Sequence, residues 1–343
     1  MEQSKWWKME LYINTPGTYV HVKDQMFEVR TPADDDSNTC KKAHFAASKV
    51  KSLILSKSAA LSTDAVFLAI ENNVDILFVK SDGFPVGRVW HSKHGSTSKI
   101  RKAQLEASLN QIGLEFVLKW VTQKIKNQES LLGNLKKHRQ DKAKLIDESI
   151  IILQNYRKKL SQFKASCTDD IADSIRGIEG NCGRIYFDML SQLIPPKYKF
   201  NGRSMRPAMD AFNAFLNYCY GILYGKVEKS LIIAGIDPFV GFLHRDDYNQ
   251  KSMVFDFIEP YRTYADEIVF KFFSTKQVRD SHYETAIHGV FLQKEGKKAI
   301  IEAFNYFMDT QKILHNGRKI TRVHSLQLDA HAFANSLLES VRK

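Results

Sequence analysis

The feature that most constrains the fold is a change in the spacing of apolar residues near position 97. Before it, short apolar runs alternate with Pro, Gly, Asn and Asp, a pattern typical of strands and turns. After it, apolar residues recur at steps of three and four, the spacing of one face of a helix. The spacing predicts an α+β chain, with a small β-rich N-terminal domain over residues 1–92 and a larger all-α C-terminal domain over residues 97–343.

Within the N-terminal part, we expect short strands at 11–13, 18–22, 26–29, 50–55, 74–79 and 86–90. Ser62 or Thr63 is expected to cap one short helix, since a hydroxyl can accept from the first unpaired backbone N–H groups. The polar, small residues 91–97 are typical of an interdomain linker. One long amphipathic helix is expected around residues 103–121, and further helices at about 141–164, 168–192, 208–234 and 260–280.

The formal charge of +12 is not shared evenly along the chain. Residues 1–96 hold 12 basic and 11 acidic side chains, whereas the remaining residues hold 38 and 27. A basic domain favours a polyanionic partner, because each phosphate it neutralises releases a condensed counterion. For any single lysine run, a solvated helix face is the alternative explanation. The clusters considered are Lys136-Lys137-His138-Arg139, Lys142, Lys144, Arg157-Lys158-Lys159, Lys197, Lys199, Arg203, Arg206, Lys226 and Lys229.

Features of membrane and exported proteins are not found in the sequence. There is no apolar run near the length of about 18 residues that spans a bilayer, and the first residues lack a signal-like apolar stretch. The four cysteines are scattered without a CxxC pair, so neither a zinc ribbon nor a disulfide framework is indicated. We therefore expect a cytoplasmic protein with reduced thiols.

Three segments of the helical domain hold ionisable residues where core residues would be expected. Glu179 lies among glycines, His244 ends an apolar stretch, and Asp256 and Glu259 are three residues apart, on one face of a helical turn. An imidazole with carboxylates suits Mg²⁺ or Mn²⁺, which can stabilise charge on a phosphodiester. From spacing alone, a boundary histidine and a simple Glu259–Arg262 pair remain alternatives.

In these segments the chain resembles the CRISPR-associated spacer-acquisition integrase and endonuclease family. The family's blocks are a glutamate followed by small residues, an arginine and an aromatic pair, then Gly-Phe-Leu-His, then Asp-Leu-x-Glu-Pro-Phe-Arg. They match Glu179-Gly180-Asn181-Cys182-Gly183-Arg184-Ile185-Tyr186-Phe187, Gly241-Phe242-Leu243-His244 and Asp256-Phe257-Ile258-Glu259-Pro260-Tyr261-Arg262. Between them, residues 206–221 resemble the family's Asn-Ala-x-Leu-Asn-Tyr-x-Tyr-Gly helix.

The resemblance implies a catalytic centre in which Glu179, His244 and Glu259 hold Mg²⁺ or Mn²⁺, with Asp256 as an auxiliary carboxylate. It also implies residues that orient ligands or bind DNA: Arg184, Tyr186, Arg206, Asn213, Asn217 and Arg262. The implied partners are double-stranded DNA with 3′ ends, CRISPR repeat DNA, a second copy of the chain, and a small ferredoxin-like CRISPR adaptation protein.

The expected reaction is metal-dependent strand transfer, in which the 3′-hydroxyl of a short DNA fragment attacks a phosphodiester at the repeat boundary. Water in place of that hydroxyl would give endonuclease activity from the same site. Two alternatives stay open at this point: a metal-dependent nuclease that does not act in integration, and a non-catalytic DNA-binding scaffold.

Overall fold

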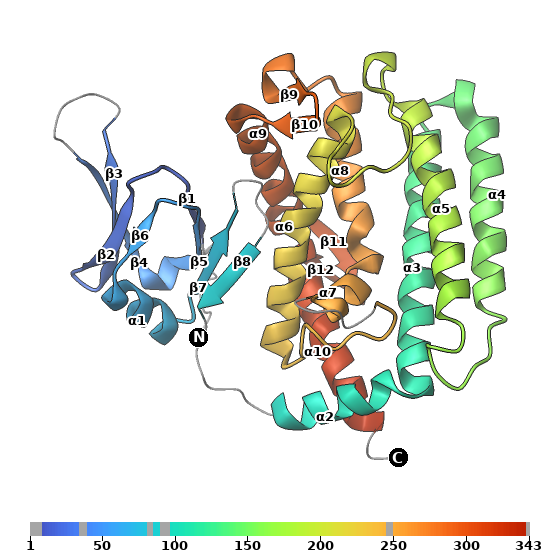
Figure 1. Cartoon of the computed structure of the whole chain (residues 1–343), viewed down its shortest axis with the longest axis horizontal. Coiled ribbons are helices and arrows are strands. Elements are labelled where there is room, and N and C mark those ends of the chain that lie inside the picture. The colour runs from blue at the N-terminus through green and yellow to red at the C-terminus, as the bar shows by residue number, and fades with distance from the viewer. Residues whose placement is uncertain (1–8, 34–39, 81–84, 90–96, 245–249, 341–343) are drawn as a thin grey trace. The chain divides into compact units, whose positions relative to one another are not determined.

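The structure, a computed structural model, describes residues 9–33, 40–80, 85–89, 97–244 and 250–340. The chain divides into two compact units, Met1–His94 and Gly95–Lys343 (Figure 1). The predicted linker at 91–97 falls outside the described residues, apart from Thr97 at the start of a helix.

The N-terminal unit contains two four-stranded sheets and a short helix, α1 (Thr63–Glu71). In the first sheet three strands are parallel and the last is antiparallel, in the order β1 (Met9–Ile13), β5 (Val50–Leu55), β7 (Asp75–Val79) and β8 (Pro85–Val89). The second sheet has the order β4 (Cys40–Ala46), β3 (Met26–Pro32), β2 (Tyr19–Lys23) and β6 (Ala60–Leu61). Val20, Phe27 and Leu53 are fully buried in the core of this unit.

The predicted strands of this unit are confirmed, except that Trp90, the last residue of the strand expected at 86–90, lies outside the described residues. The Ser62 hydroxyl caps α1 by accepting from the Ala65 N–H at 3.2 Å. The sequence pattern missed β4. That strand is mostly exposed and carries Lys41, Lys42 and His44, so it has no apolar alternation to reveal it. Pairing with β3 along its whole length, and not hydrophobic burial, holds it in the sheet.

The C-terminal unit is mainly helical, and three of its helices, α3, α4 and α5, run side by side (Figure 1). Its helices are α2 (Thr97–Ser108), α3 (Gln111–Lys136), α4 (Ala143–Leu160), α5 (Ala172–Leu193), α6 (Ala211–Ala234), α7 (Ser252–Phe257), α8 (Arg262–Ser274), α9 (Lys294–Asn305) and α10 (Arg322–Ser340). Between α7 and α8 the chain makes a single 3₁₀ turn, Glu259–Tyr261. Among the described residues, no helix is both long and apolar enough to cross a membrane.

Two details of this unit differ from the sequence prediction. The apolar pattern at 103–121 is not one helix, because the chain breaks after Ser108 and the Asn110 side chain caps α3 by accepting from the Ile112 N–H at 2.8 Å. The unit is also not all-α. It carries two short antiparallel hairpins, β9 (Tyr283–Ala286) with β10 (Gly289–Leu292), and β11 (Lys312–His315) with β12 (Arg318–Thr321).

Candidate metal centre

Two glutamates from distant parts of the helical unit meet at one ammonium group. Glu179 lies in the middle of α5, and Glu259 begins the 3₁₀ turn that follows α7. Between them lies Lys124 of α3, whose Nζ atom is 2.6 Å from Glu179 Oε1 and 2.5 Å from Glu259 Oε2. The fold therefore points two carboxylates at a single cation position.

Glu259 is the more deeply buried of the two glutamates, with 1 % of its side chain exposed against 20 % for Glu179. Arg262 Nε donates to Glu259 Oε1 at 2.6 Å. Burial works to raise the pKa of Glu259, but the charges of Arg262 and Lys124 hold that pKa well below its usual value. Glu259 is therefore an anion at neutral pH, available as a ligand for a cation.

The imidazole of His244 is held by Asp256. The imidazole Nδ1 lies 2.5 Å from Asp256 Oδ1, and with Nδ1–H donating to that carboxylate, Nε2 carries the lone pair that can bind a metal. Burial opposes protonation of His244, whereas the hydrogen bond to Asp256 and the charges of Asp256, Glu259 and Glu179 raise the pKa of the imidazole above its ordinary value. The two glutamates therefore act electrostatically on His244.

The backbone that carries His244 is held from both sides. Asp256 accepts hydrogen bonds from the N–H groups of Phe242, Leu243 and His244 at 2.5, 2.9 and 3.1 Å. On the apolar side, the ring of Phe242 stacks on Trp120 of α3 at 6.0 Å and meets Phe333 of α10 edge-on at 5.9 Å. Core packing and one buried carboxylate together set the position of the imidazole.

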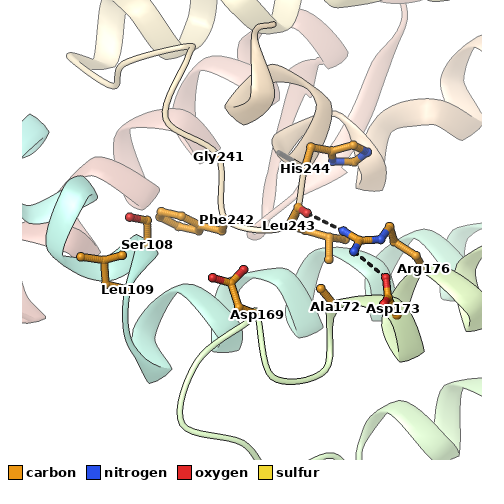
Figure 2. Close-up of a pocket in the computed structure, with 10 residues that line it drawn as sticks. All are labelled: Ser108, Leu109, Asp169, Ala172, Asp173, Arg176, Gly241, Phe242, Leu243 and His244. Carbon is orange, nitrogen blue, oxygen red and sulfur yellow. Dashed lines mark hydrogen bonds and ion pairs between the residues drawn. The ribbon is translucent and has the colours of Figure 1, made fainter. Parts of the chain in front are cut away.

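A pocket of about 450 Å³ lies against the 241–244 segment (Figure 2). Arg176, one turn before Glu179 in α5, donates to the Leu243 carbonyl at 3.0 Å and to Asp173 at 2.7 Å, as Figure 2 shows. The remaining lining residues include Ser108, Leu109, Asp169 and Ala172. The pocket thus gives solvent access to the chain around His244.

The glycines around Glu179 leave the surface of α5 open. A Cβ atom added at Gly177, Gly180 or Gly183 would meet no described atom within 4 Å, so helix packing does not require glycine at these positions. Gly177 and Gly180 are exposed. A ligand as large as a DNA backbone can therefore approach the helix closely at this point.

The side chains present have the chemistry of a site for a hard divalent cation. Carboxylates and one imidazole suit Mg²⁺ or Mn²⁺, and Glu259 Oε2 has no aligned hydrogen bond within the described part of the chain, although Lys124 Nζ lies 2.5 Å away. Among the same residues, no three His, Cys, Asp or Glu side chains are grouped closely enough to hold an ion. The chemical types of these donors suit a metal, but in this arrangement the position that Glu179 and Glu259 share is taken by the ammonium of Lys124.

The residues expected to contact DNA fall into two groups. Arg184 and Arg206 are exposed, and Asn217 and Arg262 are partly exposed. Tyr186 and Asn213 are fully buried, so neither side chain lies at the surface in this structure. These two side chains point into the interior of the helical unit, and a sequence motif alone does not indicate the direction in which a side chain points.

The buried side chains of Tyr186 and Asn213 take part in a network of polar side chains inside the helical unit. Tyr186 and Tyr220 donate their hydroxyls to Asp266 at 3.0 and 2.6 Å. Arg203 donates to Asn213 and, at 2.8 Å, to Asn217, and its guanidinium lies 5.4 Å from the centre of the Tyr220 ring. Asn213 and Asn217 therefore position Arg203, which the sequence singled out only as one of many basic residues.

Lys124 is the residue of this centre that the sequence interpretation missed. It lies on the buried side of α3, in the same helical pattern as Val117, Val121 and Leu132. A lysine on an apolar face is rare unless it is paired, so this position was the available signal. The partners themselves lie 55 and more residues away and could not be identified from spacing.

Several of the basic clusters seen in the sequence are engaged within the protein. Lys136 pairs with Asp147, Arg157 with Glu129, and Lys197 with Asp280. Lys226 is buried and pairs with Asp309 at 3.1 Å. A polyanionic partner would therefore be attracted by the net positive charge of this unit as a whole, and not by each lysine run separately.

Comparison with known proteins agrees with these sequence blocks and with the fold. The family model described as CRISPR associated protein Cas1 matches residues 11–306. A CRISPR-associated endonuclease Cas1 from Archaeoglobus fulgidus is 30 % identical over 282 residues, which cover 79 % of this chain and 81 % of the relative. One from Thermus thermophilus is 30 % identical over 263 residues, 76 % of each chain.

Solved structures with a similar fold include a casposase bound to an integration product, with a TM-score of 0.81 and 20 % identity over 97 % of this chain and 92 % of that one. A Cas1 protein from Thermotoga maritima has a TM-score of 0.76 and 17 % identity over 96 % and 97 % of the two chains. At these identities the likeness concerns the fold, and it confirms the α+β class. Because the family match spans most of the sequence, the chain belongs to the CRISPR-associated Cas1 family.

Proposed function

We propose that this chain is a CRISPR adaptation integrase that joins short double-stranded DNA with 3′ ends into repeat DNA, with Mg²⁺ or Mn²⁺ held by Glu179, His244 and Glu259. The observation that carries the proposal is the convergence of Glu179 and Glu259 on one cation position, with the imidazole of His244 oriented by Asp256 and subject to the charges of both glutamates. Curated relatives are named endonucleases, which supports phosphodiester chemistry at this site.

When bound, the divalent ion supplies electrostatic stabilisation of charge on the phosphodiester oxygens. The residues of the chain prepare the site for it. Asp256 holds the His244 tautomer, and Arg262 keeps Glu259 ionised. The open glycine face of α5 admits the DNA backbone, and exposed Arg184 on that helix is placed to pair with a phosphate.

One structural neighbour supports strand transfer, in preference to hydrolysis alone, as the reaction. The casposase of similar fold is described as bound to an integration product, which supports joining as the reaction class. The same site would act as an endonuclease when water replaces the incoming 3′-hydroxyl.

The assembly that we propose is a homodimer that works with a small ferredoxin-like CRISPR adaptation protein. A structural neighbour is a Cas6-RT-Cas1–Cas2 complex with a TM-score of 0.77, which supports a partner of the Cas2 type. A two-fold dimer also matches a duplex fragment that carries two reactive ends.

The test is a joining assay with a labelled short duplex, a supercoiled repeat plasmid, and either Mn²⁺ or EDTA, with and without the ferredoxin-like partner. Metal-dependent transfer of label to the plasmid is expected, with loss in Glu179→Ala and retention in Asp188→Ala, a change at an exposed position of the same helix. Metal-dependent nicking without transfer in the presence of the partner would identify a nuclease instead. DNA binding without any chemistry would identify a scaffold.

A further inference from the structure

Lys124 places its charge where the two glutamates would share an ion. Its Nζ atom lies within 2.6 Å of an oxygen from each of them, and only 10 % of its side chain is exposed. A Mg²⁺ ion binds carboxylate oxygens at about 2.0–2.1 Å. An ion held by Glu179 and Glu259 would therefore compete with the ammonium for the same carboxylates, and two cations held there together would repel each other.

The contacts of Glu259 show that Lys124 neutralises a specific part of the centre. Arg262 already donates to Oε1, so Oε2 is the oxygen that faces Lys124 and Glu179. This oxygen is buried and lacks an aligned hydrogen bond among the described residues. Without a positive charge at this point, two carboxylates would face each other in a poorly solvated site, which is strongly unfavourable.

The lysine stem permits exchange without movement of the helix. Lys124 is anchored in the middle of α3, which packs through Val121 and Ile125 in the core. Four methylene groups with rotatable bonds separate the Lys124 backbone from the ammonium. The ammonium can therefore move away from the carboxylates while α3 stays in place.

We propose that Lys124 is an internal counter-ion that the catalytic metal must displace from Glu179 and Glu259, so that this lysine sets the metal affinity of the centre. The inference rests on the proposed function, because it concerns the same site. Lys124 keeps the carboxylates together in the metal-free protein and competes with the ion for them. It is a positioning residue, acting through the ligands and not on the DNA.

The experiment measures Mn²⁺ binding to the full chain by the electron paramagnetic resonance signal of the unbound ion, with no DNA present. Lys124→Met removes the competing charge and is expected to tighten Mn²⁺ binding by roughly tenfold. Lys124→Arg keeps a positive charge and is expected to bind Mn²⁺ no more tightly than the wild type. Lys126→Met, at an exposed position of the same helix, is the matched control and should bind like the wild type.

A second measurement follows thermal unfolding with and without Mn²⁺. Lys124→Met should unfold at a lower temperature than the wild type without metal and gain more from Mn²⁺, because the ion then removes the repulsion between the glutamates. Lys124→Gln serves the same comparison if the methionine variant does not fold.

The outcomes separate this inference from the proposed function. Mn²⁺ binding that is lost in Glu179→Ala, but equal or weaker in the Lys124→Met and Lys124→Gln variants, would overturn the exchange and leave the metal centre standing. Absence of Mn²⁺ binding in every form would overturn the metal centre and the exchange together.

Discussion

His244 Nδ1 and Asp256 Oδ1 lie 2.5 Å apart, and the same carboxylate accepts the backbone N–H groups of the segment that carries the histidine. Asp256 is 2 % exposed, so these bonds form in a poorly solvated interior where each is expensive to lose. One side chain thus fixes both the position of the loop and the tautomer of its imidazole.

Asp256→Asn is expected to lose both stability and activity. Asparagine replaces one acceptor oxygen of Asp256 with an NH₂ group, which cannot accept from the backbone N–H groups of the 242–244 segment or from the imidazole. The free energy of unfolding, measured by urea denaturation, should therefore fall by about 1–3 kcal/mol. Joining should fall by about 10–100-fold, as for other residues that orient metal-binding histidines. His244→Ala should abolish joining with a smaller change in stability, and equal stability losses in the two variants would contradict this division of roles.

Two glycines near the site should respond oppositely to alanine. A Cβ at Gly241 would lie 2.6 Å from Ser252 Cβ and 2.9 Å from the His244 carbonyl, so Gly241→Ala should destabilise the protein by about 1–3 kcal/mol. A Cβ at Gly180 meets nothing, so Gly180→Ala should stabilise α5 by about 0.5–1 kcal/mol. Urea unfolding of both variants checks the signs, and a neutral Gly241→Ala would refute the close packing of this segment.

Arg184 and Tyr186 are two positions apart in α5 but should differ in DNA binding. Exposed Arg184, changed to alanine, should weaken binding of all duplexes and reduce the slope of log affinity against log salt by about 1. Tyr186→Phe removes a hydroxyl donated to Asp266, so stability should fall by about 0.5–1.5 kcal/mol while the salt slope stays unchanged. A changed slope in Tyr186→Phe would show that the tyrosine reaches DNA after all.

Asp266 should make stability depend on pH. Burial raises the pKa of Asp266 to about 6, against hydrogen bonds from Tyr220 and Tyr186 that lower it. Because the folded pKa exceeds the unfolded value of about 3.9, the carboxyl group favours folding most below that value, and its contribution is lost as pH rises through 6. The wild type should therefore lose about 2–3 kcal/mol relative to Asp266→Asn between pH 4 and 7.5. A difference in unfolding free energy that does not change with pH would refute the raised pKa.

The sequence predicted the α+β class and most of the strands and helices, and it singled out the three segments that hold Glu179, His244 and Glu259, because each depends on local periodicity or on a contiguous motif. It could not predict the hairpins β9–β10 and β11–β12, which are short and carry few buried residues. It joined α2 to α3, because Leu109 continues the apolar spacing although its side chain is exposed in the break between the two helices.

Residue roles were harder to predict than residue positions. Tyr186 follows Glu179 by two helical turns on the same face of α5, but Glu179 lies where that face is partly open and Tyr186 lies where the bundle closes over it. Lys124 was missed because its role depends on ion pairs with Glu179 and Glu259, which only the tertiary fold brings close to it. Periodicity tells which residues face inward, and not which of them meet.

The charged centre is drawn from three separate elements, α3, α5 and the turn before α8, and Lys124 and Glu179 alone are 55 positions apart in the sequence. No single segment of the chain contains it, so a partly folded chain holds these residues without bringing them together. If the proposed function holds, the site for DNA chemistry is therefore complete only once α3, α5 and the turn before α8 have packed together.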